Sequence, residues 1–160
     1  MEQLTLFPPP YEYIIDTCSI LSQKSDEPNR RIVLKSIWER IDGMIRDRAI
    51  VTCSEIEAEI EDDDIKQWLA QHNCCIIDVV DDEIQANVTK IVTENSGFIK
   101  LHQVKSSADA FLVATAMKYG LAVITEEKKK TQNKIPSICE SYGISCYSIM
   151  DFAQAKGWIC

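Results

Sequence analysis

The 160-residue sequence lacks several features that mark common classes of protein. It has no Cys-x-x-Cys pair, its seven cysteines are irregularly spaced, and only two histidines accompany them. This pattern argues against a disulfide framework and a zinc site, and it favours reduced thiols in a cytoplasm. No apolar run approaches the ~18 residues of a membrane span, and residues 1–10 lack the basic and apolar regions of a secretory signal. We therefore expect a cytoplasmic protein that does not enter a membrane.

Basic residues are also scarce, with 17 Lys and Arg against 25 Asp and Glu and a net charge of −8. This balance argues against a broad nucleic-acid-binding surface, because neutralising phosphates requires Lys and Arg. The charges are unevenly distributed, however. Acids crowd residues 55–64, whereas Lys128, Lys129, Lys130 and Lys134 form a local basic run. The run is compatible with a basic patch beside an acidic site and equally with a solvated lysine face.

Short apolar runs alternate with amphipathic stretches, and no repeat or linker divides the chain. We expect a single domain over residues 1–160, in which residues 1–11 are an extended lead-in because three consecutive prolines exclude a helix. Apolar strands that are separated by helices predict an α/β fold, a three-layer α/β/α sandwich with a parallel sheet of about five strands. The predicted strands are residues 13–15, 49–51, 75–80, 121–124 and 144–147.

Local signals also predict where several helices begin and end. Ser54 and Glu57 have the spacing of a capping box, which predicts a helix start at Ser54 and a structural role for Glu57. Gly120 is expected to end a helix over residues 108–119, and Ser148 is expected to cap the last helix.

Four acids stand out by their positions relative to these elements. Asp16 directly follows the first strand, and Glu127 follows the fourth. Glu59 lies in the helix after the second strand, and Asp109 lies in the first turn of its helix. Ligands of open parallel sheets bind outside the carboxyl ends of the strands, which is where Asp16 and Glu127 are expected. Each acid also has a structural interpretation, as a helix cap, a first-turn acid or part of a solvated face.

Three segments resemble, in order and spacing, the main motifs of the PIN domain family. Residues 14–17 place Asp-Thr after a strand, and residues 108–116 open a helix with Ala-Asp-Ala. Thr125 then follows Asp109 by 16 residues, and Glu127 stands two further on. Glu59 with Ile60 resembles the Glu-Leu of the second motif, although Glu55 lies one turn earlier on the same helix face and is the alternative. The resemblance spans roughly residues 12–150, and residues 64–68 and 134–139 resemble a small prokaryotic PIN subfamily.

The resemblance implies a Mg²⁺- or Mn²⁺-dependent endoribonuclease that hydrolyses RNA phosphodiester bonds. Relatives such as the VapC-type toxins are often restrained by an antitoxin, and homodimers are common among them. Asp16 and Asp109 are the expected direct metal ligands, while Glu127, also in the metal site, and Glu59 act through water or orient the attacking water. The expected supporting residues are Thr17, Ser19 and Thr125, which hydrogen-bond the carboxylates, and Lys128, Lys129, Lys130 and Lys134, which hold the RNA backbone.

Two departures from the family pattern leave another function open. Cys18 stands where many members carry Asn, and Glu127 stands where Asp is usual. Both favour the alternative of a catalytically silent PIN-like protein that works as a scaffold by binding. Apart from the resemblance, the sequence does not choose between RNA and DNA. An aspartyl phosphatase would want Asp-x-Asp after the first strand, and Cys18 occupies the second position; a receiver-type signalling domain would leave the spacing of Asp109 and Thr125 unexplained.

Overall fold

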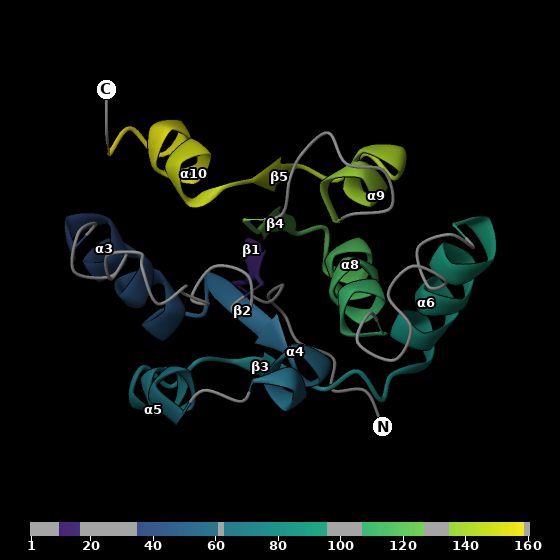
Figure 1. The fold of residues 1–160 in the computed structure, drawn as a ribbon, viewed down its shortest axis with the longest axis horizontal. Coiled ribbons are helices and arrows are strands. Elements are labelled where there is room, and N and C mark those ends of the chain that lie inside the picture. The colour runs from purple at the N-terminus through teal and green to yellow at the C-terminus, as the bar shows by residue number, and fades with distance from the viewer. Residues whose placement is uncertain (1–9, 17–34, 61–62, 96–106, 127–134, 159–160) are drawn as a thin grey trace, which may run out of the picture.

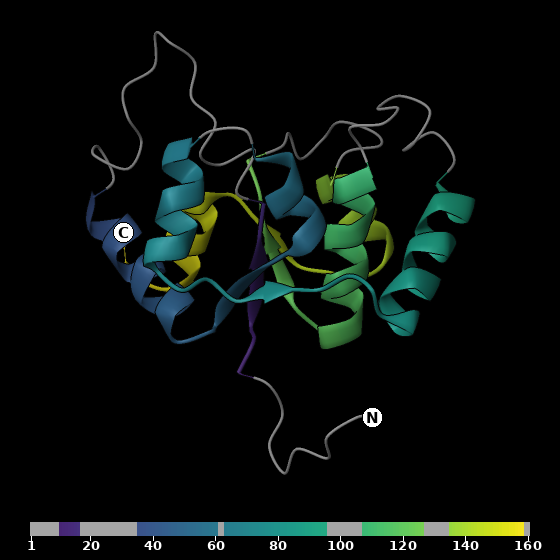
Figure 2. The same ribbon diagram turned by 90° about the horizontal axis from the view of Figure 1, so that it is seen from below.

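The protein forms one parallel β-sheet with helices on both faces (Figures 1 and 2). The structure, a computed structural model, describes residues 10–16, 35–60, 63–95, 107–126 and 135–158. Its strands follow the order β3-β2-β1-β4-β5, and every neighbouring pair is parallel. The predicted α/β sandwich with a five-stranded parallel sheet is therefore confirmed. The strands are β1 (Tyr13–Ile15), β2 (Ile50–Cys53), β3 (Ile76–Ile77), β4 (Ala122–Ile124) and β5 (Cys146–Tyr147).

The helices divide into two layers that cover the two faces of the sheet. Successive strand residues point to opposite faces, so Ile14 and Val123 belong to one apolar cluster and Ile15 and Ile124 to the other. This explains why the strands are apolar without alternation. One layer holds α3 (Lys35–Arg46), α5 (Asp63–Gln71) and α10 (Ile149–Ala155); the other holds α4 (Ser54–Glu59), α6 (Asp82–Glu94), α8 (Ser107–Tyr119) and α9 (Ile135–Ser141).

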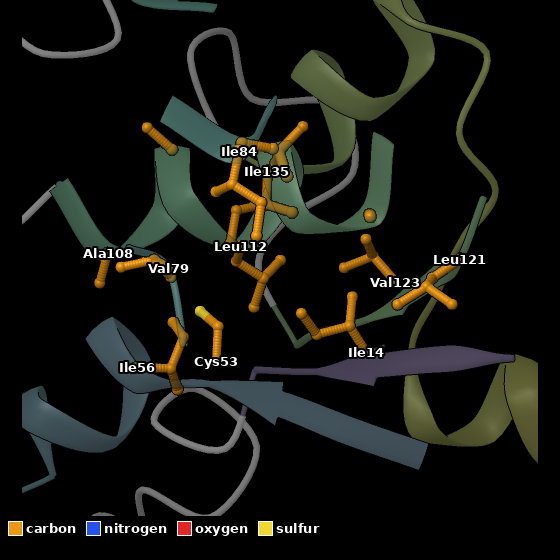
Figure 3. Packing of buried hydrophobic residues seen from close by; sticks show 14 of the residues in the cluster. Ile14, Cys53, Ile56, Val79, Ile84, Ala108, Leu112, Leu121, Val123 and Ile135 are labelled. Carbon is orange, nitrogen blue, oxygen red and sulfur yellow. The ribbon is translucent and has the colours of Figure 1, made fainter. Parts of the chain in front are cut away.

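The central helix of the second layer is α8. It is buried on most sides because it contacts the sheet as well as α4, α6 and α9 (Figure 1). Alanines at 108, 110, 114 and 116 allow these neighbours to approach closely, and Leu112 fills the centre of the cluster in Figure 3. At its end Gly120 takes a left-handed φ of 66°, as expected for the residue that stops a helix.

Most predicted element boundaries lie close to the observed ones, but the predicted capping box is wrong. Cys53, not Ser54, is the N-cap of α4 and makes no side-chain cap hydrogen bond. The Ser54 hydroxyl instead accepts a hydrogen bond from the amide of Val79 at 3.2 Å, which ties α4 to the segment after β3. The cap at Ser148 is confirmed, since its hydroxyl accepts from the amide of Asp151 at 3.1 Å.

Two further predictions concern the third strand and the N-terminal lead-in. The predicted third strand, residues 75–80, is observed only at Ile76–Ile77, because the chain turns at Asp78, whose carboxylate accepts from the amide of Val80 at 2.9 Å. Most of the lead-in, residues 1–9, lies outside the described residues. Within the ranges given above, no helix has the length and apolar character needed to span a bilayer.

Candidate functional site

The direction in which the chain adds strands to the sheet reverses between β1 and β4. From β1 the chain adds β2 and β3 on one side, and it then returns to add β4 and β5 on the other. Crossover connections on the two sides leave opposite faces, so a crevice forms outside the carboxyl ends of these central strands, where ligands of open α/β sheets bind. Asp16 and Thr125 directly follow β1 and β4 at this position. The strand order therefore brings together two residues that the chain separates by 109 positions.

Asp16 is the most deeply buried acid of the described chain, with 3% of its surface exposed. Its amide donates to the carbonyl oxygen of Ile124 at 2.9 Å. Its carboxylate oxygen Oδ2 accepts from the hydroxyl Oγ1 of Thr125 at 3.0 Å, and Thr125 is itself 2% exposed. The predicted hydrogen bond from Thr125 to a carboxylate is confirmed. A buried carboxylate is unfavourable unless hydrogen bonds or a cation compensate for lost water, so Asp16 occupies a position that suits a cation.

The helix after β2 carries both candidates for the second acid, and their environments differ. The side chain of Glu55 is half-buried, whereas that of Glu59 is exposed. The pKa of the neighbouring Cys53 thiol is raised to about 11, mainly because the thiol is buried and in smaller part because the carboxylates of Glu55 and Asp16 lie nearby. Burial favours Glu55, the alternative from the sequence, over Glu59 as the acid of the site, because Glu55 is the less exposed of the two.

Asp109 is brought to the same edge by the direction of α8. This helix leads directly into β4 and runs opposite to the strands, so its first turn lies at the carboxyl edge of the sheet (Figure 2). Ala108 and Ala110 are buried on either side of Asp109, which is half-buried. Ala108 belongs to the same apolar cluster as Cys53 and Ile56 at the start of α4 (Figure 3). The helix dipole at this end also favours a negative charge.

Glu126, which precedes the predicted ligand Glu127, has a structural partner. Its carboxylate oxygen Oε1 accepts from the amide of Ile149 at 2.9 Å, at the start of α10. First-turn amides of a helix have no intrahelical acceptor, so Glu126 satisfies one of them and ties the end of β4 to α10. Of the two consecutive glutamates, the structure thus gives the first a role in holding the fold.

Other predicted site residues lie outside the described part of the chain. Without them, the described residues contain no group of three or more His, Cys, Asp or Glu side chains arranged to hold a metal ion. Of the three metal ligands expected from the sequence, Asp16 and Asp109 are described by the structure, whereas Glu127 lies outside the described residues. The residues not described are Thr17, Cys18, Ser19, Glu127, Lys128, Lys129, Lys130 and Lys134.

Two surface cavities in the described structure are lined by neither Asp16, Asp109 nor Glu55. One, of about 540 Å³, lies at the amino edge of the sheet between β1, β4 and β5 and is lined in part by Gly120 and Gly143. The other, of about 580 Å³, lies between α4 and α5. Since the candidate site is at the carboxyl edge, neither cavity belongs to it.

A buried polar cluster between α3 and α5 was not predicted. The indole Nε1 of Trp68 donates to Oδ1 of Asp42 at 2.9 Å, and Nε2 of His72 lies 3.3 Å from Oδ2 of the same carboxylate. The other ring nitrogen of His72, Nδ1, lies 2.8 Å from the carbonyl oxygen of Trp68. Asp42 follows Ile41 inside an amphipathic helix, and an acid beside the apolar stripe was the only sequence signal. The cluster joins two helices of one layer and so has a structural role.

Comparison with known proteins gives a family without a known activity. The model of DUF4411, described as a domain of unknown function, matches residues 13–160 and so covers all five strands. No curated protein matches the chain.

Proposed function

The chain belongs to the DUF4411 family of domains of unknown function, and from its site we propose that it is a metal-dependent endoribonuclease. The observation that carries the proposal is the buried carboxylate of Asp16 at the switch point of the sheet, hydrogen-bonded by Thr125. Glu55 lies in the first turn of α4, directly after β2, and Asp109 lies in the first turn of α8, which leads into β4. Carboxylates that lie close together repel one another unless a cation lies among them, and we propose that these acids share such a cation with Glu127.

The chemistry of these donors fits a hard divalent cation. Carboxylate oxygens are the preferred ligands of Mg²⁺ and Mn²⁺, and we propose Asp16, Asp109 and Glu127 as the residues that hold the ion. When bound, such an ion lowers the pKa of a coordinated water and withdraws charge from the scissile phosphate.

The residues of the chain have separate roles in this proposal. Thr125 orients the carboxylate of Asp16 through the hydrogen bond at 3.0 Å. Glu55, in preference to Glu59, accepts a proton from the attacking water or orients that water. Lys128, Lys129, Lys130 and Lys134 contact the phosphate backbone, a proposal that rests on the sequence alone.

The substrate and the biological setting rest on the resemblance to PIN domains. We propose RNA as the substrate, an antitoxin as a partner, a homodimer as the assembly and the cytoplasm as the location.

The decisive experiment compares the wild-type protein with Asp16→Asn, using Asp47→Asn, an exposed aspartate outside the site, as the matched control. Structured RNA and DNA of the same sequence are incubated with each protein in Mn²⁺ or in chelator. We expect metal-dependent cleavage of RNA by the wild-type protein and Asp47→Asn, and a loss of at least about 100-fold in Asp16→Asn. Cleavage that persists in Asp16→Asn would remove the proposal, and cleavage of DNA alone would change the substrate.

A scaffold is the second candidate, because Cys18 and Glu127 depart from the pattern of the resembled family. Such a protein would bind RNA or a partner without cutting it. Metal-dependent RNA binding measured by fluorescence anisotropy, with the RNA recovered intact after long incubation in Mn²⁺, would favour the scaffold over the enzyme.

A further inference from the structure

Besides β1 and β4, strand β2 also helps to hold Asp16 in position. On β2, Thr52 has none of its surface exposed, and its hydroxyl Oγ1 donates to the carbonyl oxygen of Ile15 at 3.2 Å. The backbone of Thr52 bonds in the other direction, since its amide donates to the carbonyl oxygen of Cys75 at 3.1 Å, just before β3. Thr52 therefore links the end of β1 to the far side of the sheet.

Ile15 precedes Asp16, so the carbonyl that Thr52 contacts and the amide of Asp16 belong to one peptide group. The carbonyl accepts from Thr52 on β2, and the amide donates to Ile124 on β4 at 2.9 Å. The peptide is planar and its carbonyl and amide point in opposite directions. Its plane is thus held from both neighbouring strands, and the plane determines the direction in which the side chain of Asp16 leaves the backbone.

The choice of residue at position 52 supports a specific use of the hydroxyl. Its neighbours Ile50, Val51 and Cys53 are apolar and have no exposed surface. Valine has nearly the same shape as threonine, favours strands equally and carries no buried polar group. A buried hydroxyl is tolerated only where it finds a partner, and here that partner is the peptide before Asp16.

We infer that Thr52 is a positioning residue for the site, which sets the orientation of Asp16 through the Ile15 carbonyl without contacting metal or substrate. This inference rests on the proposed function only in taking Asp16 as a metal ligand. Groups that orient a metal ligand typically change metal affinity about 10- to 100-fold when they are removed. Because Thr52 acts through one peptide group, we expect the lower end of this range.

The test compares Thr52→Val, which removes the hydroxyl at nearly constant shape, with Thr52→Ser, which keeps it. Thr115→Val is the matched control, because Thr115 is another fully buried threonine whose hydroxyl donates to a carbonyl, that of Phe111 within α8 at 2.7 Å. The first readout is the midpoint of a Mn²⁺ titration of the folded protein, followed by calorimetry at one temperature, which measures metal affinity. We expect this midpoint to rise about tenfold in Thr52→Val and to stay at the wild-type value in Thr52→Ser and Thr115→Val.

A second readout needs no metal. In metal-free protein, hydrogen exchange at the amide of Asp16 should quicken about tenfold in Thr52→Val relative to exchange at Val123 in the same protein. A general loss of stability would quicken both amides together. If Thr52→Val did not fold, Thr52→Ala would remove the same hydroxyl and be judged by the same two measurements.

The outcomes separate this inference from the proposed function. A wild-type protein that does not respond to Mn²⁺, with selective exchange at Asp16 still observed in Thr52→Val, would remove the proposed function and leave the orientation of Asp16 by Thr52 supported. If the wild-type protein responds to Mn²⁺ and Thr52→Val responds with the same midpoint, the inference is overturned and the proposed function stands. Equal acceleration at Asp16 and Val123 would also overturn it.

Discussion

The hydroxyl of Thr125 donates to the carboxylate of Asp16 at 3.0 Å, although 109 residues separate them in the chain. Both side chains are almost fully buried. The contact exists because β1 and β4 are neighbours in the sheet and both residues leave it at the same edge. It joins two motifs that the sequence displays only separately, and it is the structural basis for treating them as one site.

This bond predicts the behaviour of Thr125→Val. Removing the hydroxyl leaves one oxygen of a buried carboxylate without this partner, so the variant should lose about 1–3 kcal/mol of unfolding free energy in metal-free buffer. Its Mn²⁺ affinity should fall about 10- to 100-fold, while Thr125→Ser keeps both properties. Urea unfolding and titration calorimetry measure the two effects. A Val variant equal to the wild type in both would show that the bond has no role at the site.

The two glutamates of α4 should differ in their effect on cleavage. Glu55 is half-buried beside Cys53, and Glu59 is exposed. Glu55→Gln should lower kcat about 100-fold, and Glu59→Gln should leave it nearly unchanged, because we propose Glu55 as the acid that acts on the attacking water. Single-turnover rates at saturating Mn²⁺ measure the difference. The reverse order of effects would restore the assignment of Glu59 that the family pattern suggested.

The cluster of Asp42, Trp68 and His72 should affect stability without affecting the site. Trp68→Phe removes the indole donor from a buried carboxylate and should reduce the free energy of unfolding by about 1–3 kcal/mol. The rise in melting temperature caused by Mn²⁺ should stay as in the wild type. A double-mutant cycle with Asp42→Asn, measured by urea unfolding, should give a coupling of at least about 0.5 kcal/mol. Additive effects would show that the bond contributes nothing beyond packing.

An ion pair between α8 and the start of α6 predicts a pH dependence. Lys118 donates to the carboxylate of Asp81 and lowers its pKa below the ordinary 3.8, while this bond raises the pKa of Lys118 above 10.5. The lowered acid contributes stability above its unfolded pKa that is lost as pH falls through its folded pKa. The raised base contributes stability below its unfolded pKa that is lost as pH rises through its folded pKa.

Lys118→Met should therefore be less stable than the wild type by up to about 1 kcal/mol between roughly pH 5 and 9, because both groups are charged there. The difference should shrink toward both extremes. Urea unfolding at a series of pH values measures it. A difference that stays constant down to about pH 2 would assign the loss to packing of the lysine stem.

Local features of the sequence determined much of the fold. The short apolar strands, the cap at Ser148 and the stop at Gly120 were predictable because each depends on a few neighbouring residues. The positions of Asp16 after β1 and of Asp109 in the first turn of α8 were predictable for the same reason. The parallel sheet followed from apolar strands that alternate with helices.

Only the tertiary structure decided which groups meet. Strand order brought Thr125 to Asp16, and the burial of α4 separated Glu55 from Glu59, which the sequence pattern treats almost alike. The hydroxyl of Ser54 bonds to Val79 after β3 instead of capping its own helix, and Thr52 reaches across to β1. Such choices depend on the distance between elements that are remote in the chain. Sequence periodicity predicts which way a residue points within its own element, but it does not predict the distance between two elements that are remote in the chain.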